Sequence, residues 1–176
     1  MTMSRTLVAY ASRMGGTEGI ARAVADELRR GGLDVDLIPA ADVRDGAGYD
    51  AVVLGSGLYA GRWLRPARAL LKKLAANRKL GHPVPVWLFH SGPLGPGQAH
   101  TTVPAPGKVA AYAIALGANP PTTFGGRIEP ATAKGIVAGS MAKSDLAGDY
   151  RDFAQITDWA RKIAVELAAS TTGATS

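Results

Sequence analysis

Short apolar runs of strand length alternate with segments of helical periodicity along the whole chain. In the first unit, an apolar run over residues 6–11 passes through a glycine-bearing loop into a helix with one apolar face. Five strands that alternate with helices predict an α/β fold, in which helices cover both faces of a parallel sheet. The expected strands are residues 6–11, 33–38, 51–56, 86–89 and 121–126, and the expected later helices are residues 64–76, 108–116 and 152–168.

Two of these runs predict their own places in the sheet. Residues 33–38 alternate between apolar and polar side chains, which is typical of a strand that is exposed on one side, and we place them at a sheet edge. Residues 51–56 are continuously apolar or small, which indicates a central strand that is buried on both faces. Pro85 is unsuited to a strand interior, so the fourth strand should begin just after it.

The loop after the first strand has the composition of an anion-binding site. It consists of Ser12, Arg13, Met14, Gly15, Gly16 and Thr17. Backbone N–H groups at a helix N-terminus lack partners within the helix, the helix dipole favours negative charge there, and glycine allows close approach. These properties suit a phosphate group. The loop matches neither GxGxxG nor GxxxxGK(S/T), and an ordinary turn with Thr17 as the N-cap is the alternative interpretation.

Two further loops rich in glycine and hydroxyl groups follow expected strands, at residues 56–63 and 90–98. In an open parallel sheet, ligands bind outside the carboxyl ends of the strands, where the strand order reverses. We therefore expect both loops to meet residues 11–17 at one edge of the sheet and to form a single binding site there.

The first loop resembles the phosphate loop of flavodoxins, whose pattern Ser/Thr-x-x-Gly-x-Thr is met by residues 12–17. The segment YDAVVLGSGLYAGRW at 49–63, with GDYRDF at 148–153 and WARKI at 159–163, narrows the resemblance to flavodoxin-domain proteins related to the menaquinone-dependent protoporphyrinogen dehydrogenase. The resemblance covers about residues 5–168. It implies a three-layer αβα flavodoxin-like fold, a five-stranded parallel sheet in the order 2-1-3-4-5, and bound FMN.

The resemblance also assigns FMN to individual residues. The phosphate would lie on residues 12–17, although Met14 stands where many flavodoxins have a hydroxyl residue. The isoalloxazine ring would lie between two groups, which are Ser56, Gly57, Leu58, Tyr59, Ala60 and Gly61, and Ser91, Gly92, Pro93, Leu94 and Gly95. Backbone groups of residues 57–61 and 91–95 would hydrogen-bond the ring edge and tune its reduction potential.

Aromatic and histidine side chains near these loops have competing interpretations. Tyr59 is expected to supply an aromatic face for the flavin ring, with Trp63 in reserve. Packing of Trp63 under the following helix is the alternative. His90, at the end of a strand, is a candidate proton donor, and a structural or solvent-facing histidine is the more common case. The catalytic residues therefore stay unknown.

Composition excludes several classes of function. We expect one domain over residues 1–168 and a disordered tail over residues 169–176. The chain has no cysteine, which excludes thiolate chemistry, and its three histidines lack metal-ligand spacing, so no metal site is expected. The formal net charge is +6, but Lys and Arg are spread along the sequence without a nucleic-acid motif, and we interpret them as solvated surface charge. No apolar run approaches the roughly 18 residues of a spanning helix, which predicts a cytoplasmic protein.

Three hypotheses of function stay open. The first is an FMN-dependent oxidoreductase that acts on a quinone or a protoporphyrinogen-like tetrapyrrole, and the second is a one-electron carrier that docks on redox proteins. The third is an FMN-free binding module. Residues 127–149, expected to be an irregular insertion with a short helix near 134–142, are less bulky and less basic than the corresponding region of the protoporphyrinogen enzyme. This difference weighs against a tetrapyrrole and leaves peripheral membrane contact open.

Overall fold

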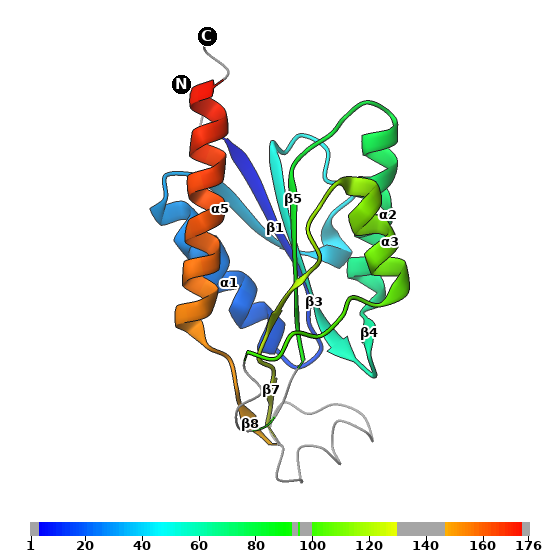
Figure 1. Cartoon of the computed structure of the whole chain (residues 1–176), viewed down its shortest axis with the longest axis vertical. Coiled ribbons are helices and arrows are strands. Elements are labelled where there is room, and N and C mark those ends of the chain that lie inside the picture. Colours follow the sequence, from blue (N-terminus) through cyan, green and yellow to red (C-terminus); the bar gives the residue numbers. More distant parts are fainter. Residues whose placement is uncertain (1–3, 93–94, 96–99, 130–146, 174–176) are drawn as a thin grey trace.

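Five parallel strands form the central sheet (Figure 1). The structure is a computed structural model that describes residues 4–92, 95, 100–129 and 147–173. The strands are β1 (Arg5–Ala11), β2 (Asp34–Pro39), β3 (Ala51–Tyr59), β5 (Val86–Ser91) and β6 (Thr122–Phe124), in the order β2-β1-β3-β5-β6. The two-residue strand β4 (Arg62–Trp63) pairs antiparallel with the end of β3. Without β4, this is the order 2-1-3-4-5, so the flavodoxin-like fold and its strand order are confirmed.

Helices cover both faces of the sheet (Figure 1). The helices α1 (Gly16–Arg30) and α5 (Phe153–Gly173) lie on one face, and α2 (Arg65–Lys79), α3 (Gly107–Leu116) and the 3-10 turn η1 (Ala40–Asp42) lie on the other. Side chains alternate along β3, so Val52 and Leu54 join the core beneath α2 and α3, while Ala51 and Val53 join the core beneath α1 and α5. β1 and β3 are therefore buried on both sides, and β2 is a half-buried edge strand as its sequence pattern predicts.

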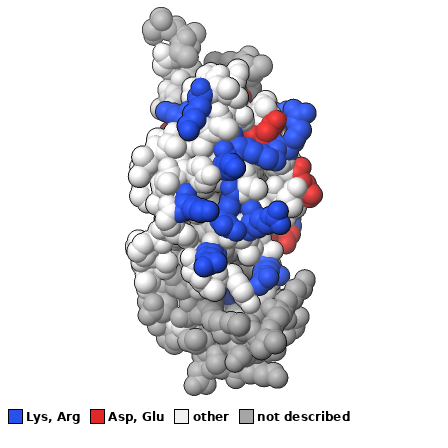
Figure 2. Space-filling model, turned by 90° about the vertical axis from the view of Figure 1, so that its right-hand side faces the viewer, with Lys and Arg blue, Asp and Glu red and all other residues white. Residues whose placement is uncertain are grey.

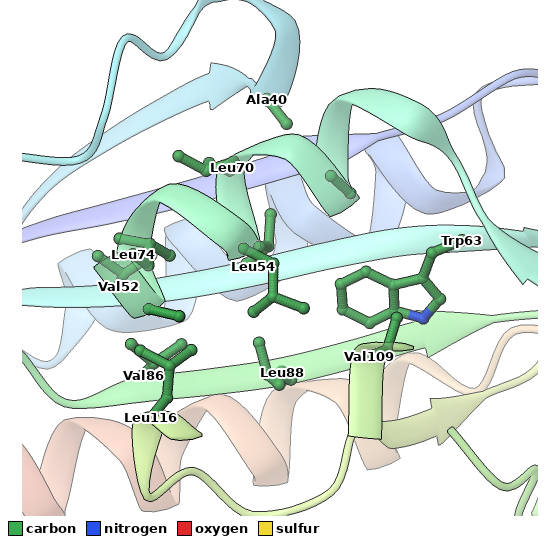
Figure 3. Close-up of a cluster of buried hydrophobic side chains, with 14 of the residues drawn as sticks. Ala40, Val52, Leu54, Trp63, Leu70, Leu74, Val86, Leu88, Val109 and Leu116 are labelled. Carbon is green, nitrogen blue, oxygen red and sulfur yellow. The ribbon is translucent and has the colours of Figure 1, made fainter. Parts of the chain in front are cut away.

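The core beneath α2 and α3 contains the indole of Trp63 (Figure 3). This side chain is 2% exposed and belongs to the same buried hydrophobic cluster as Leu54, Leu70 and Val109. The β3–β4 hairpin explains its position, because Ala60 and Gly61 both have positive φ, which gives a tight two-residue turn. The expectation that Trp63 could serve as a reserve face for the flavin is therefore wrong, and its alternative role in the core is correct.

The core beneath α1 and α5 depends on a glycine in β3. Phe89, Phe124 and Trp159 make mutual ring contacts with centroids 5.5–5.8 Å apart. The Phe89 ring lies directly over Gly55, where an added Cβ would come within 2.0 Å of the ring. Only glycine at this position lets the three aromatic rings pack against the sheet.

Several boundaries differ from the sequence predictions. α2 ends at Lys79 and α5 at Gly173, each later than expected. Arg78 and Lys79 are good helix formers, whereas in the last turns of α5 the hydroxyls of Ser170, Thr171 and Thr172 donate to backbone carbonyls four residues earlier. α1 begins at Gly16 with Gly15 as its N-cap, so the interpretation of Thr17 as the N-cap is wrong. A hairpin of β7 (Arg127–Ile128) and β8 (Gly148–Asp149) was not expected. The helix expected near 134–142 lies outside the described residues.

Candidate functional site

A cavity of about 280 Å³ opens at the carboxyl ends of the parallel strands. The lining comes from all three loops that the sequence singled out, together with the start of the β7–β8 hairpin. Its residues are Ser12, Arg13, Met14, Gly16, Thr17, Gly57, Leu58, Tyr59, Ala60, Leu64, Ser91, Gly92, Gly126, Arg127 and Ile128. Segments far apart in the sequence therefore meet at one site, at the edge where a doubly wound sheet binds its ligands.

The conformation of the loop between β1 and α1 is fixed by a left-handed glycine and by hydrogen bonds of its hydroxyl groups. Gly15 has φ +79°, a left-handed conformation that favours glycine, and its N–H donates to the Oγ of Ser12 at 3.1 Å. The hydroxyls of Thr17 and Ser91 lie 2.8 Å apart and are hydrogen-bonded, which joins the first loop to the third. A Cβ on Gly57 would approach the Thr17 hydroxyl to 3.1 Å, so a glycine at 57 keeps this junction compact.

An arginine from the β7–β8 hairpin lies against the same loop. A Cβ on Gly15 would lie 3.7 Å from the guanidinium of Arg127, and a Cβ on Gly16 would lie 3.4 Å from the Arg127 Cβ. The Nε of Arg127 is buried and has no hydrogen-bond partner among the described residues. A buried cationic donor that lacks a partner is costly unless an anion accepts from it. The cavity therefore offers positive charge and backbone amides at one end.

Arg151 fixes the hairpin against α1. Its guanidinium donates to both carboxylate oxygens of Asp149, at 2.8 and 2.6 Å, and to the backbone oxygen of Gly16 at 3.2 Å. The hydrogen bonds from Arg151 hold the pKa of the Asp149 carboxyl below its usual value. This anchor keeps Arg127 beside the loop, since Arg127 and Asp149 are paired across the two strands.

Much of the remaining cavity lining is apolar or aromatic. Tyr59, Leu58, Leu64 and Ile128 contribute its larger side chains. The backbones of Gly92 and Gly126, which also line the cavity, lie close together. A Cβ on Gly126 would come within 3.1 Å of the Gly92 carbonyl oxygen. The Arg13 guanidinium lies 4.2 Å from the centre of the Tyr59 ring, in a cation–π contact. An aromatic face and aliphatic walls are groups that suit a flat heteroaromatic ring.

The structure brings most of the predicted site residues to the cavity, but not all. Gly15, Ser56, Gly61 and Gly95 are not among the lining residues, and Pro93 and Leu94 lie outside the described part of the chain. Ser56 has a structural role instead: its hydroxyl accepts from the Leu64 N–H and donates to the Gly57 carbonyl, both at 2.9 Å. Sequence reasoning missed Leu64, Gly126, Arg127 and Ile128. The glycine pair after the fifth expected strand could have indicated Gly126.

His90 is a buried structural residue and does not line the cavity. Its Nδ1 accepts from the indole Nε1–H of Trp63 at 3.2 Å, so the neutral ring carries its proton on Nε2. That N–H faces the Thr123 hydroxyl at 2.9 Å and the Val103 carbonyl at 3.1 Å. Burial lowers the pKa of His90 from 6.5 to about 4, which keeps the ring neutral at physiological pH. The structural interpretation of His90 therefore holds, and the proton-donor interpretation is wrong.

Two kinds of feature are absent from the described residues. No helix there is both long and apolar enough to cross a membrane. Nor does that part of the chain gather three or more histidine or carboxylate side chains in a way that could hold a metal ion.

Comparison with known proteins identifies the family. The flavodoxin domain model matches residues 7–108, which is more than half of the chain. The chain belongs to the flavodoxin-domain family. The match includes most of β1, all of β2 to β5 and the loops that carry most of the cavity lining. β6, which lies beyond the match, pairs with β5 in the same sheet.

Solved structures share the fold of this flavodoxin domain. An archaeal flavodoxin superposes with a TM-score of 0.63 at 18% identity, over 93% of this chain and 99% of that one. A flavodoxin of Streptococcus pneumoniae TIGR4 gives 0.57 at 20% identity, over 95% and 99%. The rubredoxin oxygen:oxidoreductase of Desulfovibrio gigas gives 0.62 at 18% identity, over 94% of this chain but only 36% of its own length. The domain therefore matches whole flavodoxins and one part of a larger oxidoreductase.

A flavodoxin domain implies FMN as the cofactor. The residues present fit it. The unpartnered Nε of Arg127 and the N-terminus of α1 suit a phosphate, and the slot between Tyr59 and the Gly92–Gly126 contact suits a flat ring.

Proposed function

We propose that this flavodoxin domain is an FMN-dependent electron-transfer protein that holds the nucleotide across the carboxyl edge of its sheet. In this arrangement, the phosphate lies on residues 12–17 beside Arg127, and the isoalloxazine ring lies against Tyr59. One observation carries the proposal: three glycine-bearing loops and one buried, unpartnered arginine nitrogen converge on the same cavity.

The protein's part in the chemistry is binding and positioning. Bound FMN supplies the redox chemistry, because it accepts and releases electrons. Thr17 and Ser91 hold the first and third loops together, and the backbone of Gly92 and Gly126 narrows the slot for the ring. Arg13, over Tyr59, places positive charge beside the position proposed for the ring. His90 takes no part, since it is buried behind the slot with both ring nitrogens hydrogen-bonded.

Two classes of electron acceptor fit this site. The apolar side chains of Leu58, Leu64 and Ile128 favour a planar apolar molecule, such as a quinone or a tetrapyrrole, stacked at the cavity mouth. The exposed arginines next to Tyr59 favour a redox protein instead. Relation to the protoporphyrinogen dehydrogenase and a cytoplasmic location stay predictions.

Titration of the apoprotein with FMN and with riboflavin tests the proposal. Quenching of flavin fluorescence gives both dissociation constants, and we expect FMN to bind at least about tenfold more tightly, because riboflavin lacks the phosphate for the loop and Arg127. Equal affinity for the two flavins would refute the placement of the phosphate. Failure to bind either flavin would leave the FMN-free binding module. Steady-state oxidation of the reduced holoprotein by menadione then separates a quinone reductase from a carrier.

A further inference from the structure

The positive charge of the chain is concentrated in one uninterrupted segment. Between Asp50 and Glu129 the sequence contains nine Lys and Arg residues and neither Asp nor Glu. The whole chain has 20 basic and 14 acidic residues, so the remainder holds 11 basic residues against 14 acidic ones and is net acidic. The apparent spread of Lys and Arg along the sequence therefore conceals a strong bias between two parts of the fold.

The fold gathers this charge on the side of α2 and α3. Figure 2 shows this side of the molecule, with a group of basic side chains over it and acidic side chains only along one border. Adjoining surface hollows are lined by the residues that we call the basic face, namely Arg62, Arg65, Arg68, Lys72 and Lys108. All five are exposed, and they come from β4, α2 and the first turn of α3.

The basic face is unpaired, in contrast to the opposite side of the molecule. On α1 and α5, the carboxylates of Glu18, Asp26, Glu27 and Asp158 each contact an arginine. No Lys or Arg of residues 51–128 forms an ion pair within the part of the chain that the structure describes. Like charges gathered without counter-charges produce a strong local field, which attracts partners of opposite sign.

The basic face is continuous with the rim of the flavin cavity. One hollow is lined both by Arg62, Arg65 and Arg68 and by Arg13 and Tyr59, and the last two also line the cavity. The β3–β4 hairpin causes this continuity, because Tyr59 and Arg62 are paired across its turn. A molecule bound to the basic face would therefore lie next to the position proposed for the isoalloxazine ring.

We propose that the basic face docks an acidic one-electron redox protein, which exchanges electrons with the FMN of this chain. This inference rests on the proposed function, since it needs FMN in the cavity. When bound, FMN would supply the single electron that reduces the oxidised metal centre of the partner, and any proton released would pass to water. Complementary charge would raise the rate of encounter and orient the partner toward the flavin.

The position of the apolar side chains favours a protein over a lipid surface. Peripheral binding to a membrane combines basic residues with apolar side chains that insert beside them. The large apolar side chains exposed on this side are Leu80, which directly follows the last residue of α2, and Ile114, near the C-terminal end of α3. The cavity and the hollow that adjoins it lie at the opposite, N-terminal end of α2, beside Arg65. Arg62, Arg65 and Arg68 therefore lie next to the redox site, where an electron-transfer partner must dock, and away from these apolar side chains.

Stopped-flow oxidation of the reduced holoprotein tests the inference. The acceptors are plastocyanin, an acidic copper protein, and cytochrome c, a basic haem protein, each at low and high ionic strength. We expect the rate with plastocyanin to fall as salt is added and the rate with cytochrome c not to fall. The triple variant Arg65→Gln/Arg68→Gln/Lys72→Gln should lower the plastocyanin rate at low salt by roughly tenfold, because steering depends on these charges.

A control variant removes the same charge from the opposite side, as Arg22→Gln/Arg30→Gln/Lys162→Gln, all exposed positions on α1 and α5. It should leave the plastocyanin rate within about twofold of the wild type, because none of these residues lines the cavity or the hollow beside it. Equal losses in the two variants would overturn the proposal, since net charge alone would then set the rate. Binding to phosphatidylserine vesicles that needs the basic face, without a preference for plastocyanin, would also overturn it. FMN content measured in each preparation separates this failure from a failure to bind the cofactor.

Discussion

The buried His90 makes the stability of the fold depend on pH. In the unfolded chain its pKa is 6.5, whereas burial lowers the pKa in the folded chain to about 4. Below pH 6.5 the unfolded chain therefore binds a proton at this histidine that the folded chain does not bind. The free energy of unfolding falls as the pH falls. Above pH 7 both states are neutral, and the group has no effect.

The size of this effect follows from the pKa difference. A shift from 6.5 to about 4 corresponds in full to about 3 kcal/mol of unfolding free energy, and about 2 kcal/mol of it is lost between pH 7 and pH 5. Carboxylates contribute little in this range, because they titrate mainly below pH 5. The lowered pKa of Asp149 moves the loss of its contribution to still lower pH.

Urea unfolding of the flavin-free protein measures this loss, with tryptophan fluorescence as the signal. We would use a His82→Gln/His100→Gln background, which leaves His90 as the only histidine. The midpoint should fall from pH 7 to pH 5 with an unchanged slope, and an NMR titration of the same protein should give the His90 pKa directly. A constant free energy of unfolding over this range, or a His90 pKa near 6.5, would contradict the structure. Either result would show that His90 can be protonated within the Trp63–His90–Thr123 network.

Two substitutions test other parts of the structure. Gly55→Ala should lower the free energy of unfolding by about 2 kcal/mol or more, because its Cβ would meet the Phe89 ring at 2.0 Å, whereas Gly107→Ala, where a Cβ meets nothing within 4 Å, should be close to neutral in the same thermal melt. Equal melting temperatures for the two variants would contradict the packing described for Gly55. Arg127→Gln should weaken FMN roughly tenfold in a fluorescence titration while leaving riboflavin unchanged, through loss of a charge-assisted hydrogen bond to phosphate. The same loss in Arg22→Gln, on an exposed helix face, would instead indicate a general effect of charge.

Regularities of the backbone made most of the fold predictable from sequence. Apolar runs of strand length gave the order of elements, and the alternation in residues 33–38 correctly placed β2 at the edge. Burial from both sides made residues 51–56 continuously apolar, as observed in β3. These features are local, because each strand's own side chains record which of its faces is covered.

Features that depend on contacts between distant segments could not be predicted. Tyr59 and Trp63 stand in one loop and are both aromatic, so composition did not separate them. Their difference arises from the β3–β4 pairing, in which Trp63 lies opposite Leu58 and Tyr59 opposite Arg62. Arg127 was missed for a similar reason, since its approach to Gly15 depends on a hairpin whose strands are about 20 residues apart in the sequence.

Buried charged side chains in the described structure form ion pairs, with the exception of one arginine at the cavity. Where water is excluded, charges are paired: the side chains of Glu27 and Arg151 are only 11% and 8% exposed, and both form ion pairs. Where water screens them, as on the basic face, charges are left unpaired at little cost. Arg127 departs from this rule, because its Nε is buried without a hydrogen-bond partner in the described structure. A phosphate on the neighbouring loop would supply the missing acceptor, so electrostatics and backbone geometry independently select the same end of the cavity.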